Sequence, residues 1–509
     1  MASSTSSVAD SDGDSSASSQ ELLSILQPLG YSANSCGYCS EIKGGRSTAK
    51  SSKSYGCWAH VLSASTYKGL LDRGFRRSGA YLYKPDMAAT CCPQYTITLD
   101  ASAFKPSRSQ RQVLQRFAAF MRDGEREGQA GWGPAPSERS GAADAEMDEA
   151  SVKGAAKGRE KGKGKGKAGQ SAAADWGEAV HAGDWEQSNP TEPFKHRFEY
   201  IVEPASYTDE KYALFRRYQM EVHSEPASKV SAKGFRRFLV DTPLELEPTR
   251  SSAYSYGSHH ALYRLDGKLI AFAVLDLLPK AVSSVYFVWD PDYAGMSLGK
   301  VSALREAQMV REMERAGAWE GEGGRYMMGF YIHSCPKMRY KADYQPSLLL
   351  DPETNAYYPW SQCKPLLDTG SRITSFATVP DPLDPSAPVA FERAASGAPQ
   401  SSHDKPETST HKEGDKDDED REQASDEDEE DDEDDDDVDF PSPPPPGCLE
   451  PTTLSKDLLL RALALERRAI MPLLLSTAWH DPQSQAEVRE LLASVGERLV
   501  GKIAVWLGR

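Results

Sequence analysis

Two apolar stretches decide the fold of this 509-residue chain, Leu269-Ile-Ala-Phe-Ala-Val-Leu-Asp-Leu-Leu278 and Val282-Ser-Ser-Val-Tyr-Phe-Val-Trp289. Turn residues bound them at Asp266-Gly267, Pro279 and Asp290-Pro291, so we expect two strands joined as a hairpin. Residues 297–314 then place apolar side chains at helical spacing behind a possible Ser297 cap, and residues 326–332 read as another strand. This order predicts an α/β (α+β) domain built around one sheet.

Composition divides the chain into six segments. The two lobes with enough apolar residues for a core are residues 21–122, which contain four cysteines, and residues 191–378, which contain the hairpin. Between them we expect a flexible basic, Gly-rich insertion at 123–190. We also expect a disordered tail at 1–20, a disordered Pro-rich and acidic segment at 379–448, and C-terminal helices at 449–509.

The formal net charge of −17 comes from one region. Residues 404–439 hold 22 acidic and four basic residues, whereas residues 21–122 hold 14 basic and five acidic residues. An acidic chain argues against a nucleic-acid partner, because phosphate binding requires an excess of Lys and Arg. The uneven distribution removes that objection for the basic lobe. The acidic run is then either a solvated tail or a competitor for the basic surface.

The sequence predicts no membrane segment and no secretory signal. The longest apolar run, residues 269–275, ends at Asp276, and the first 20 residues are rich in Ser with three Asp. Eight cysteines in a chain of this length do not make a disulfide scaffold. We therefore expect a cytoplasmic protein, with the nucleus as a second location, that is a monomer or a weak oligomer.

Four cysteines have the spacing of a metal site, because Cys36 and Cys39 form a CxxC and Cys91 and Cys92 are adjacent. A short turn directs two thiolates to one centre, so two such loops predict a four-thiolate site for zinc or an iron–sulfur cluster. Neighbouring residues diverge and would crowd a single zinc tetrahedron, which favours a cluster. Buried free cysteines with a redox-active CxxC are the alternative.

Basic residues of the same lobe alternate with aromatic residues. Cations bind phosphates and aromatic rings stack on unpaired bases, so this composition suits RNA, although a solvated basic face fits equally well. The candidates for RNA contact are Arg73, Arg76, Arg77 and Lys84.

Polar residues at the ends of the predicted strands are the candidates for chemistry. Asp276 interrupts an apolar strand, where a carboxylate must be paired or functional. His333 ends the strand 326–332, a position at which a histidine is more often structural than catalytic. Lys337 and Arg339 in the next loop could hold a carboxylate. The nucleotide-binding motifs G-x-x-x-x-G-K-[ST] and G-x-G-x-x-G are absent from the sequence.

Several longer motifs closely resemble the eukaryotic arginyl-tRNA–protein transferases of the arginine N-degron pathway. In the first half these motifs are Cys36-Gly-Tyr-Cys39, Tyr55-Gly-Cys-Trp-Ala-His60, Asp72-Arg-Gly-Phe-Arg-Arg-Ser-Gly79 and Thr90-Cys-Cys-Pro-Gln-Tyr-Thr-Ile97. In the second half they include Val274-Leu-Asp276, Val282-Ser-Ser-Val-Tyr-Phe287 and Met328-Gly-Phe-Tyr-Ile-His-Ser-Cys-Pro-Lys-Met-Arg-Tyr-Lys341. The resemblance covers residues about 31–122 and 194–368, as in a fungal-like member with long insertions.

The resemblance implies transfer of arginine from arginyl-tRNA to the α-amine of acceptor proteins that begin with Asp, Glu or oxidised Cys, which marks them for ubiquitin-dependent degradation. It implies two lobes, the second similar to the GCN5-related N-acetyltransferase (GNAT) fold with aminoacyl-tRNA in place of acyl-CoA. It also implies that Cys36, Cys39, Cys91 and Cys92 bind an iron–sulfur cluster of the [4Fe–4S] type, with zinc as an alternative occupant.

The expected roles of the remaining candidates follow from this reaction. We expect His333 to accept or relay a proton, with Tyr331 and Asp276 as the other catalytic residues. Substrate-binding roles are expected for Lys337, Arg339, Asp290 and Tyr286, and tRNA-binding roles for Arg73, Arg76, Arg77 and Lys84. Two other classes remain open at this point: a non-catalytic RNA-binding or redox- and metal-sensing protein, and an acyl-CoA-dependent N-acetyltransferase.

Overall fold

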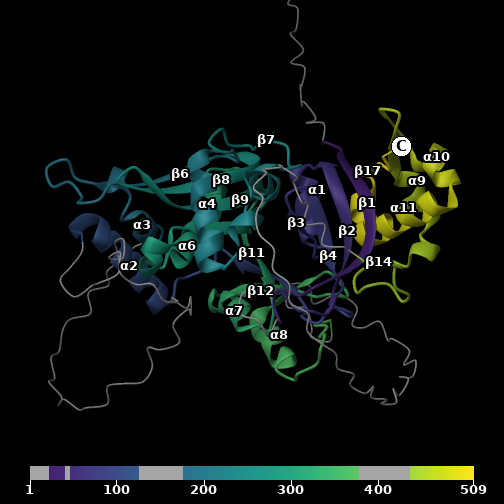
Figure 1. Ribbon diagram of the computed structural model, residues 1–509, viewed down its shortest axis with the longest axis horizontal. Helices are drawn as coiled ribbons and strands as arrows, with labels where there is room; N and C mark the ends of the chain where they lie inside the picture. The colour runs from purple at the N-terminus through teal and green to yellow at the C-terminus, as the bar shows by residue number, and fades with distance from the viewer. Residues whose placement is uncertain (1–21, 40–45, 125–175, 378–435, 509) are drawn as a thin grey trace, which may run out of the picture.

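The computed structural model describes residues 22–39, 46–124, 176–377 and 436–508, which build two sheets lying side by side (Figure 1). The first sheet has the strand order β16-β15-β17-β1-β2-β4-β3, with β14 also paired to β1. Its strands are β1 (Ser24–Asn34), β2 (Ser52–Val61), β3 (Arg76–Ser78), β4 (Tyr81–Pro85), β14 (Asp436–Val438), β15 (Leu463–Glu466), β16 (Ala469–Pro472) and β17 (Ile503–Val505).

The second sheet has the order β13-β12-β5-β11-β10-β9-β8-β6, with β7 paired to β8. Its strands are β5 (Tyr95–Asp100), β6 (Phe198–Pro204), β7 (Glu247–Pro248), β8 (Ser255–Leu265), β9 (Lys268–Leu278), β10 (Ala281–Trp289), β11 (Arg325–Tyr331), β12 (Ser347–Leu350) and β13 (Tyr357–Pro359). Most neighbours are antiparallel, and β10 and β11 are parallel.

The predicted hairpin is confirmed, because β9 and β10 pair antiparallel with Ala281 opposite Leu278. The strand β9 is apolar throughout because both of its faces are covered. Ala273 and Leu275 face a core shared with α2 and α6, whereas Phe272 and Val274 face α4 and α5. Such double coverage explains why this stretch does not alternate between apolar and polar residues.

The predicted long helix is also confirmed, as α6 (Leu298–Arg315). Val301, Leu304 and Val310 recur at helical spacing and are fully buried against the second sheet, each contributing about 1.5–3 kcal/mol through burial. The expected cap at Ser297 is wrong, because this residue has a left-handed backbone (φ 54°) and its side chain caps nothing. The short helix η4 (Pro291–Met296) runs directly into α6, and Ser297 makes the turn between them.

The remaining helices cover the two sheets. Those beside the second sheet are α2 (Arg108–Asp123), α3 (Trp176–His181), η1 (Trp185–Gln187), α4 (Asp209–Val222), η2 (Ala227–Lys229), α5 (Ala232–Phe235), η3 (Arg236–Val240), α7 (Pro336–Arg339), η5 (Tyr340–Asp343) and α8 (Trp360–Leu367). Those beside the first sheet are α1 (Ala64–Leu71), η6 (Pro451–Thr453), α9 (Lys456–Arg461), η7 (Leu473–Leu475), α10 (Thr477–His480), α11 (Pro482–Val495) and α12 (Glu497–Val500). Among the described residues, no helix combines the length and the apolar character needed to cross a membrane.

The C-terminal segment differs from the helices predicted for 449–509. It does contain α9 to α12, yet residues 463–472 form the strands β15 and β16, and β17 joins them to β1 in the first sheet. Leu and Ala dominate residues 457–465 and favour helix in isolation, but pairing with strands that are distant in sequence overrides that preference. The first sheet is therefore completed by the last residues of the chain (Figure 1).

Three other predicted boundaries need correction. Tyr95–Asp100 and α2 were assigned to the first lobe but belong to the second sheet and its core. The end of the 123–190 insertion is α3, whose Trp176 packs edge-on against Phe104 at 5.3 Å. The end of the 379–448 segment is β14, and the following Phe440 packs against Tyr55. The predictions of disorder for 1–20 and of flexibility for most of these two segments concern residues outside the described ranges.

The two lobes meet over the end of the hairpin. Leu278, Ala281 and Met327 of the second sheet are buried in the core of the first lobe. At the same boundary, Gly79 between β3 and β4 has φ +57°, and a Cβ atom there would lie 2.1 Å from the backbone oxygen of Arg237. Only glycine allows η3 to approach this turn so closely.

Candidate functional site

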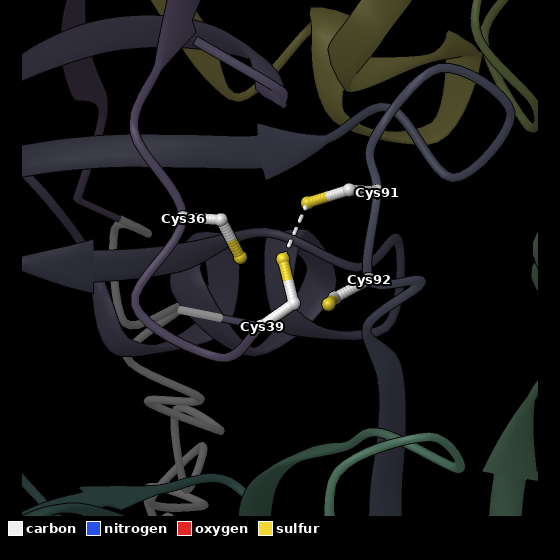
Figure 2. A group of neighbouring side chains, drawn as sticks. All are labelled: Cys36, Cys39, Cys91 and Cys92. Atoms are coloured by element: carbon white, nitrogen blue, oxygen red, sulfur yellow. Dashed lines mark hydrogen bonds between the residues drawn. The ribbon is translucent and has the colours of Figure 1, made fainter. Parts of the chain in front are cut away.

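Four cysteines converge at one end of the first sheet (Figure 2). Cys36 and Cys39 lie just after β1, and Cys91 and Cys92 lie in the loop between β4 and β5. Their four sulfur atoms all lie within 4.8 Å of one another, and the Sγ atoms of Cys39 and Cys91 are 3.5 Å apart. The prediction that these residues form one site able to hold a metal is confirmed.

The chemistry of this donor set fits a metal. Thiolates are soft ligands that suit zinc and iron–sulfur centres. Cys36 and Cys92 are buried, and Cys39 is exposed, so the site has a protein side and a solvent side. The buried side is closed by Ile332, Cys335 and Met338 from the segment after β11. The four-cysteine site therefore packs directly on the segment that was predicted to carry the chemistry.

Tyr331 and His333 are brought together as predicted. The Tyr331 hydroxyl lies 2.8 Å from Nδ1 of His333, and Nε2 of His333 lies 3.3 Å from a carboxylate oxygen of Asp368. Donation by the phenol to Nδ1 leaves the proton of the neutral imidazole on Nε2, facing Asp368. Burial lowers the pKa of His333, so the ring is neutral at pH 7 and able to accept a proton.

A bulge in β11 sets the direction of the Tyr331 and His333 side chains. Pairing of β11 with β5 shifts register between Met327 and Phe330, and Gly329 has φ +73°. Two cations hold the distorted backbone: Nη2 of Arg76 donates to the Gly329 oxygen at 3.1 Å, and Nζ of Lys341 donates to the Phe330 oxygen at 2.8 Å. Burial lowers the pKa of Lys341 to about 7. Bulges beside active sites commonly redirect a side chain in this way.

Asp276 does not belong to this site. It is fully buried and forms a two-point ion pair with Arg77 at 2.6 and 2.8 Å, and it also accepts a hydrogen bond from Ser258 at 2.7 Å. The ion pair joins β9 of the second sheet to β3 of the first sheet. This pairing satisfies the carboxylate at the lobe boundary and favours a structural role, and the catalytic role of Asp276 stays a prediction.

Asp290 also forms ion pairs within the protein, and its substrate role stays a prediction. The side chains of Arg217 and Lys268 each approach it at 2.7 Å. Tyr286 lies elsewhere, with its hydroxyl donating to Gln219 at 3.1 Å and its ring 5.0 Å from that of Phe238. A substrate role for Tyr286 remains a prediction.

Three of the four predicted tRNA-binding cations are buried, and the fourth, Arg73, is half-buried. Arg76, Arg77 and Lys84 are each at most 7% exposed, and Lys84 donates to the backbone oxygen of Arg73. Arg73 itself donates to the backbone oxygens of Gly447 and Ser494. Burial and existing hydrogen bonds leave Arg76, Arg77 and Lys84 little access to phosphates, and a tRNA-binding role for the four residues stays a prediction.

Lys337 and Arg339 lie on α7 and are exposed, as a carboxylate-binding pair requires. Within the described ranges neither of them forms an ion pair. Arg339 is close enough to add to the lowering of the His333 pKa, so the predicted acceptor site lies beside the predicted base. Asp368 and Lys341 were not predicted as site residues; Lys341 ends the Met328–Lys341 motif, whereas Asp368 carries no signal in the sequence.

Together these features define a two-lobed α/β protein in which a four-thiolate centre supports a short Tyr–His segment flanked by free cations. Two family models match the chain: "Arginine-tRNA-protein transferase, N terminus" over residues 34–112 and "Arginine-tRNA-protein transferase, C terminus" over residues 210–351. These ranges contain all four metal-site cysteines and the Tyr331–His333 segment.

Similar proteins agree with both models. Arginyl-tRNA–protein transferase 2 of Arabidopsis thaliana is 30% identical, covering 68% of this chain and 76% of the relative. Arginyl-tRNA–protein transferase 1 of Drosophila melanogaster is 32% identical, covering 66% of this chain and 82% of the relative. The enzyme of the same name from Saccharomyces cerevisiae is 33% identical over 62% of this chain and 54% of its own length. This chain belongs to the arginyl-tRNA–protein transferase family.

Proposed function

We propose that this protein transfers arginine from arginyl-tRNA to the α-amine of acceptor proteins that begin with Asp, Glu or oxidised Cys, and so marks them for ubiquitin-dependent degradation. The observation that carries the proposal is the continuous segment from Tyr331 to Arg339. It places a neutral imidazole, a hydrogen-bonded phenol and two exposed cations side by side within the region that matches the family.

The reaction is aminolysis of an ester. The acceptor nitrogen attacks the arginyl carbonyl, the new C–N bond forms, the C–O bond to the tRNA ribose breaks, and the ribose oxygen takes up a proton. An α-amine has a pKa of about 7.7–8.0, so a useful fraction is already neutral at pH 7. Correct alignment of amine and ester therefore supplies most of the rate enhancement, and the protein must also accept one proton.

His333 is the proposed proton acceptor. The Tyr331 phenol takes up the proton that leaves the attacking nitrogen and passes its own proton to Nδ1, and the Nε2–H contact with Asp368 stabilises the imidazolium that forms. Tyr331 fixes the tautomer of the resting enzyme by donating to Nδ1. Lys337 and Arg339 bind the acidic side chain of the first acceptor residue and so place the amine near His333.

The four thiolates are proposed to hold a metal that joins two loops of the first lobe and braces them against Ile332 and Cys335. A zinc ion with Zn–S distances of about 2.3 Å places its ligands about 3.8 Å apart. All four sulfur atoms lie within 4.8 Å of one another, and on this closeness we base the proposal of a single tetrahedral ion. A [4Fe–4S] cluster, in which each cysteine would bind a different iron, would be held by the same four residues.

Metal analysis of protein purified without oxygen distinguishes these occupants. One zinc per chain without acid-labile sulfide would rule out the cluster. Stoichiometric iron and sulfide, with charge-transfer absorption in the visible spectrum, would rule out the single-ion proposal and bear out the prediction of an iron–sulfur cluster.

The activity is tested with arginyl-tRNA labelled in the amino acid and a peptide that begins with Asp. We expect label in this peptide, and none in matched peptides that begin with Ala or with N-acetylated Asp. Transfer of an acetyl group from acetyl-CoA instead would favour the N-acetyltransferase class. Binding of tRNA without any transfer would favour the non-catalytic class. A fluorescent fusion expressed in cells tests the expected cytoplasmic and nuclear location.

A further inference from the structure

The helix α2 presents a line of cations to solvent. Residues 101–122 hold five basic residues and no acidic residue. Three of the arginines, Arg108, Arg111 and Arg122, are exposed. Arg111 lies three residues after Arg108 and eleven before Arg122, so with 3.6 residues per turn the three side chains share one side of the helix, over about 21 Å. We call these three residues the basic stripe.

The guanidinium groups of the basic stripe are available to a ligand. Within the described residues none of the three forms an ion pair, and the side-chain hydrogen bond found in the stripe runs from Nη1 of Arg111 to the backbone oxygen of Pro106 at 2.6 Å. Arg116 and Asp123 are also exposed on α2, but both already have an interaction partner in the chain, and neither belongs to the stripe.

A shared core fixes α2 relative to the proposed active site. Val113, Phe117 and Met121 on its inner side are buried in the same hydrophobic core as Tyr331. The strand that precedes α2 is β5, whose first residue, Tyr95, pairs with Tyr331. Figure 1 shows α2 on the side of the second lobe that faces away from the first sheet. The stripe therefore lies on a support that is rigidly joined to the reacting segment, on a side of the lobe that the first sheet does not cover.

The composition of α2 indicates which ligand suits the stripe. No large apolar side chain is exposed along this helix, all of which the structure describes. Gln112 and Gln115 are exposed among the cations, and amides of this kind hydrogen-bond to phosphate oxygens. Membrane-binding helices insert apolar residues, and the centres of protein interfaces are rich in aromatic residues, so α2 fits neither of these partners well. Arginines interspersed with glutamines fit a phosphate backbone.

We propose that the basic stripe binds the phosphate backbone of the double-helical part of arginyl-tRNA while the amino-acid end lies at His333. This assignment rests on the proposed function. Phosphate contacts hold a nucleic acid without reading its sequence, so the stripe supplies affinity that is common to all tRNAs. An acidic protein surface is the competing ligand, because it carries the same sign of charge.

Two arginines of the stripe allow a matched test. The double variant Arg108→Gln/Arg122→Gln removes two charges and keeps side chains that favour helix. Arg108 is the first residue of α2 and Arg122 lies in its last turn, where the helix dipole disfavours and favours a cation respectively, so their effects on stability oppose each other. The control Arg467→Gln/Arg468→Gln removes two charges from an exposed turn between β15 and β16. Circular dichroism and thermal unfolding establish that each variant is folded.

Equilibrium binding of unacylated tRNA is measured from 50 to 250 mM salt. We expect the stripe variant to bind about 10-fold more weakly at low salt, with a log–log salt slope shallower by about 1–2, because each phosphate contact contributes about 0.9. The loss should be the same for an arginine-accepting tRNA and for a tRNA of another specificity, and the control should match wild type. Unchanged affinity and slope in the stripe variant, an equal loss in the control, or a loss confined to one tRNA would overturn the proposal.

Poly-glutamate is the probe for the competing ligand. We expect the stripe variant to lose more affinity for tRNA than for poly-glutamate. Wild-type affinity for tRNA combined with weaker binding of poly-glutamate would overturn the proposal and assign the stripe to an acidic protein.

Steady-state transfer keeps this proposal separate from the proposed function. The stripe variant should raise the KM for arginyl-tRNA and leave the KM for the peptide unchanged. A lower kcat with unchanged tRNA binding would overturn the assignment. Absence of transfer by the wild-type protein would refute the proposed function alone, since the tRNA-binding comparison would still decide the role of the basic stripe.

Discussion

The substitution Asp276→Asn tests whether the Asp276 carboxylate has a structural or a catalytic role. Asp276 and Arg77 are at most 2% exposed in their side chains and join the two lobes through two short contacts. The Asn side chain has nearly the same shape and can still accept one hydrogen bond, but it leaves the Arg77 guanidinium buried without a countercharge. Removing one partner of a buried pair costs about 3–5 kcal/mol, and we expect a value near the lower end because one hydrogen bond survives.

The assay is urea unfolding at 25 °C followed by tryptophan fluorescence, combined with arginine transfer at a temperature where the variant is folded. A loss of about 3 kcal/mol raises the unfolding equilibrium constant more than 100-fold. Glu320→Gln breaks the exposed pair with Arg250 and should change stability by less than about 0.5 kcal/mol. The double variant Arg77→Met/Asp276→Leu removes both charges and should recover most of the stability.

Activity decides between the two roles of Asp276. We expect the folded Asp276→Asn protein to keep kcat within a few-fold of wild type, because its contacts are Arg77 and Ser258. Wild-type stability combined with a large loss of kcat would refute this reasoning and restore the catalytic assignment.

Three further predictions concern single residues. His333→Gln should lower kcat by about 100-fold with little change in peptide KM, since general-base catalysis contributes about 10²–10⁴, and near-normal turnover in steady-state assays would remove His333 from catalysis. Gly79→Ala should lower the free energy of unfolding, measured in urea, by about 2 kcal/mol or more, because φ is positive at this position and the added Cβ would clash with the backbone oxygen of Arg237. Gly501→Ala is the neutral control, because Gly501 has φ −75° and an added Cβ would meet open space. Hydrogen bonds that the His181 ring donates to the carboxylates of Asp184 and Glu312 raise its pKa from 6.5 to about 9, so its contribution to stability is complete below about pH 6.5 and lost as pH rises through 9. The melting temperature of His181→Gln should therefore fall below wild type at pH 6.5 and converge with it at pH 9.5, and a constant difference would contradict the charge on His181.

The central part of the fold could be predicted because its signals are local. The hairpin depends on two apolar runs and a two-residue turn, and α6 depends on helical spacing, so both could be read from short windows. The strands β15 to β17 could not, since they are three or four residues long and join the sheet only because β17 pairs with β1, where Ile503 lies opposite Ser24. Short strands of this kind are set by tertiary contacts and not by composition.

The metal site was predictable for a different reason. Thiolate pairs in CxxC and CC arrangements have a small set of uses, so Cys36, Cys39, Cys91 and Cys92 could be joined without knowledge of the fold. Cations have many uses. Arg77 forms a buried ion pair and Arg76 holds a backbone bulge, whereas Arg236 and Arg237 lie on the surface with the same residue type. Whether an arginine is structural or available for binding depends on whether its side chain is buried. Burial of a charged residue that lies among aromatic residues cannot be predicted from the sequence.

The arrangement of β11 explains why the metal centre and the proposed chemistry belong to one enzyme. From Gly329 to Arg339 one stretch of backbone carries the bulge, the base, the contact with the cysteines and the acceptor-binding cations. Ile332 and Cys335, on either side of His333 in the sequence, pack in one buried cluster with Cys36 and Cys92, so a movement of the two cysteine loops is expected to displace the imidazole. A buried, closely packed contact absorbs little displacement. Loss of the metal should therefore loosen His333 and α7 together, and acceptor binding and proton transfer should weaken in parallel.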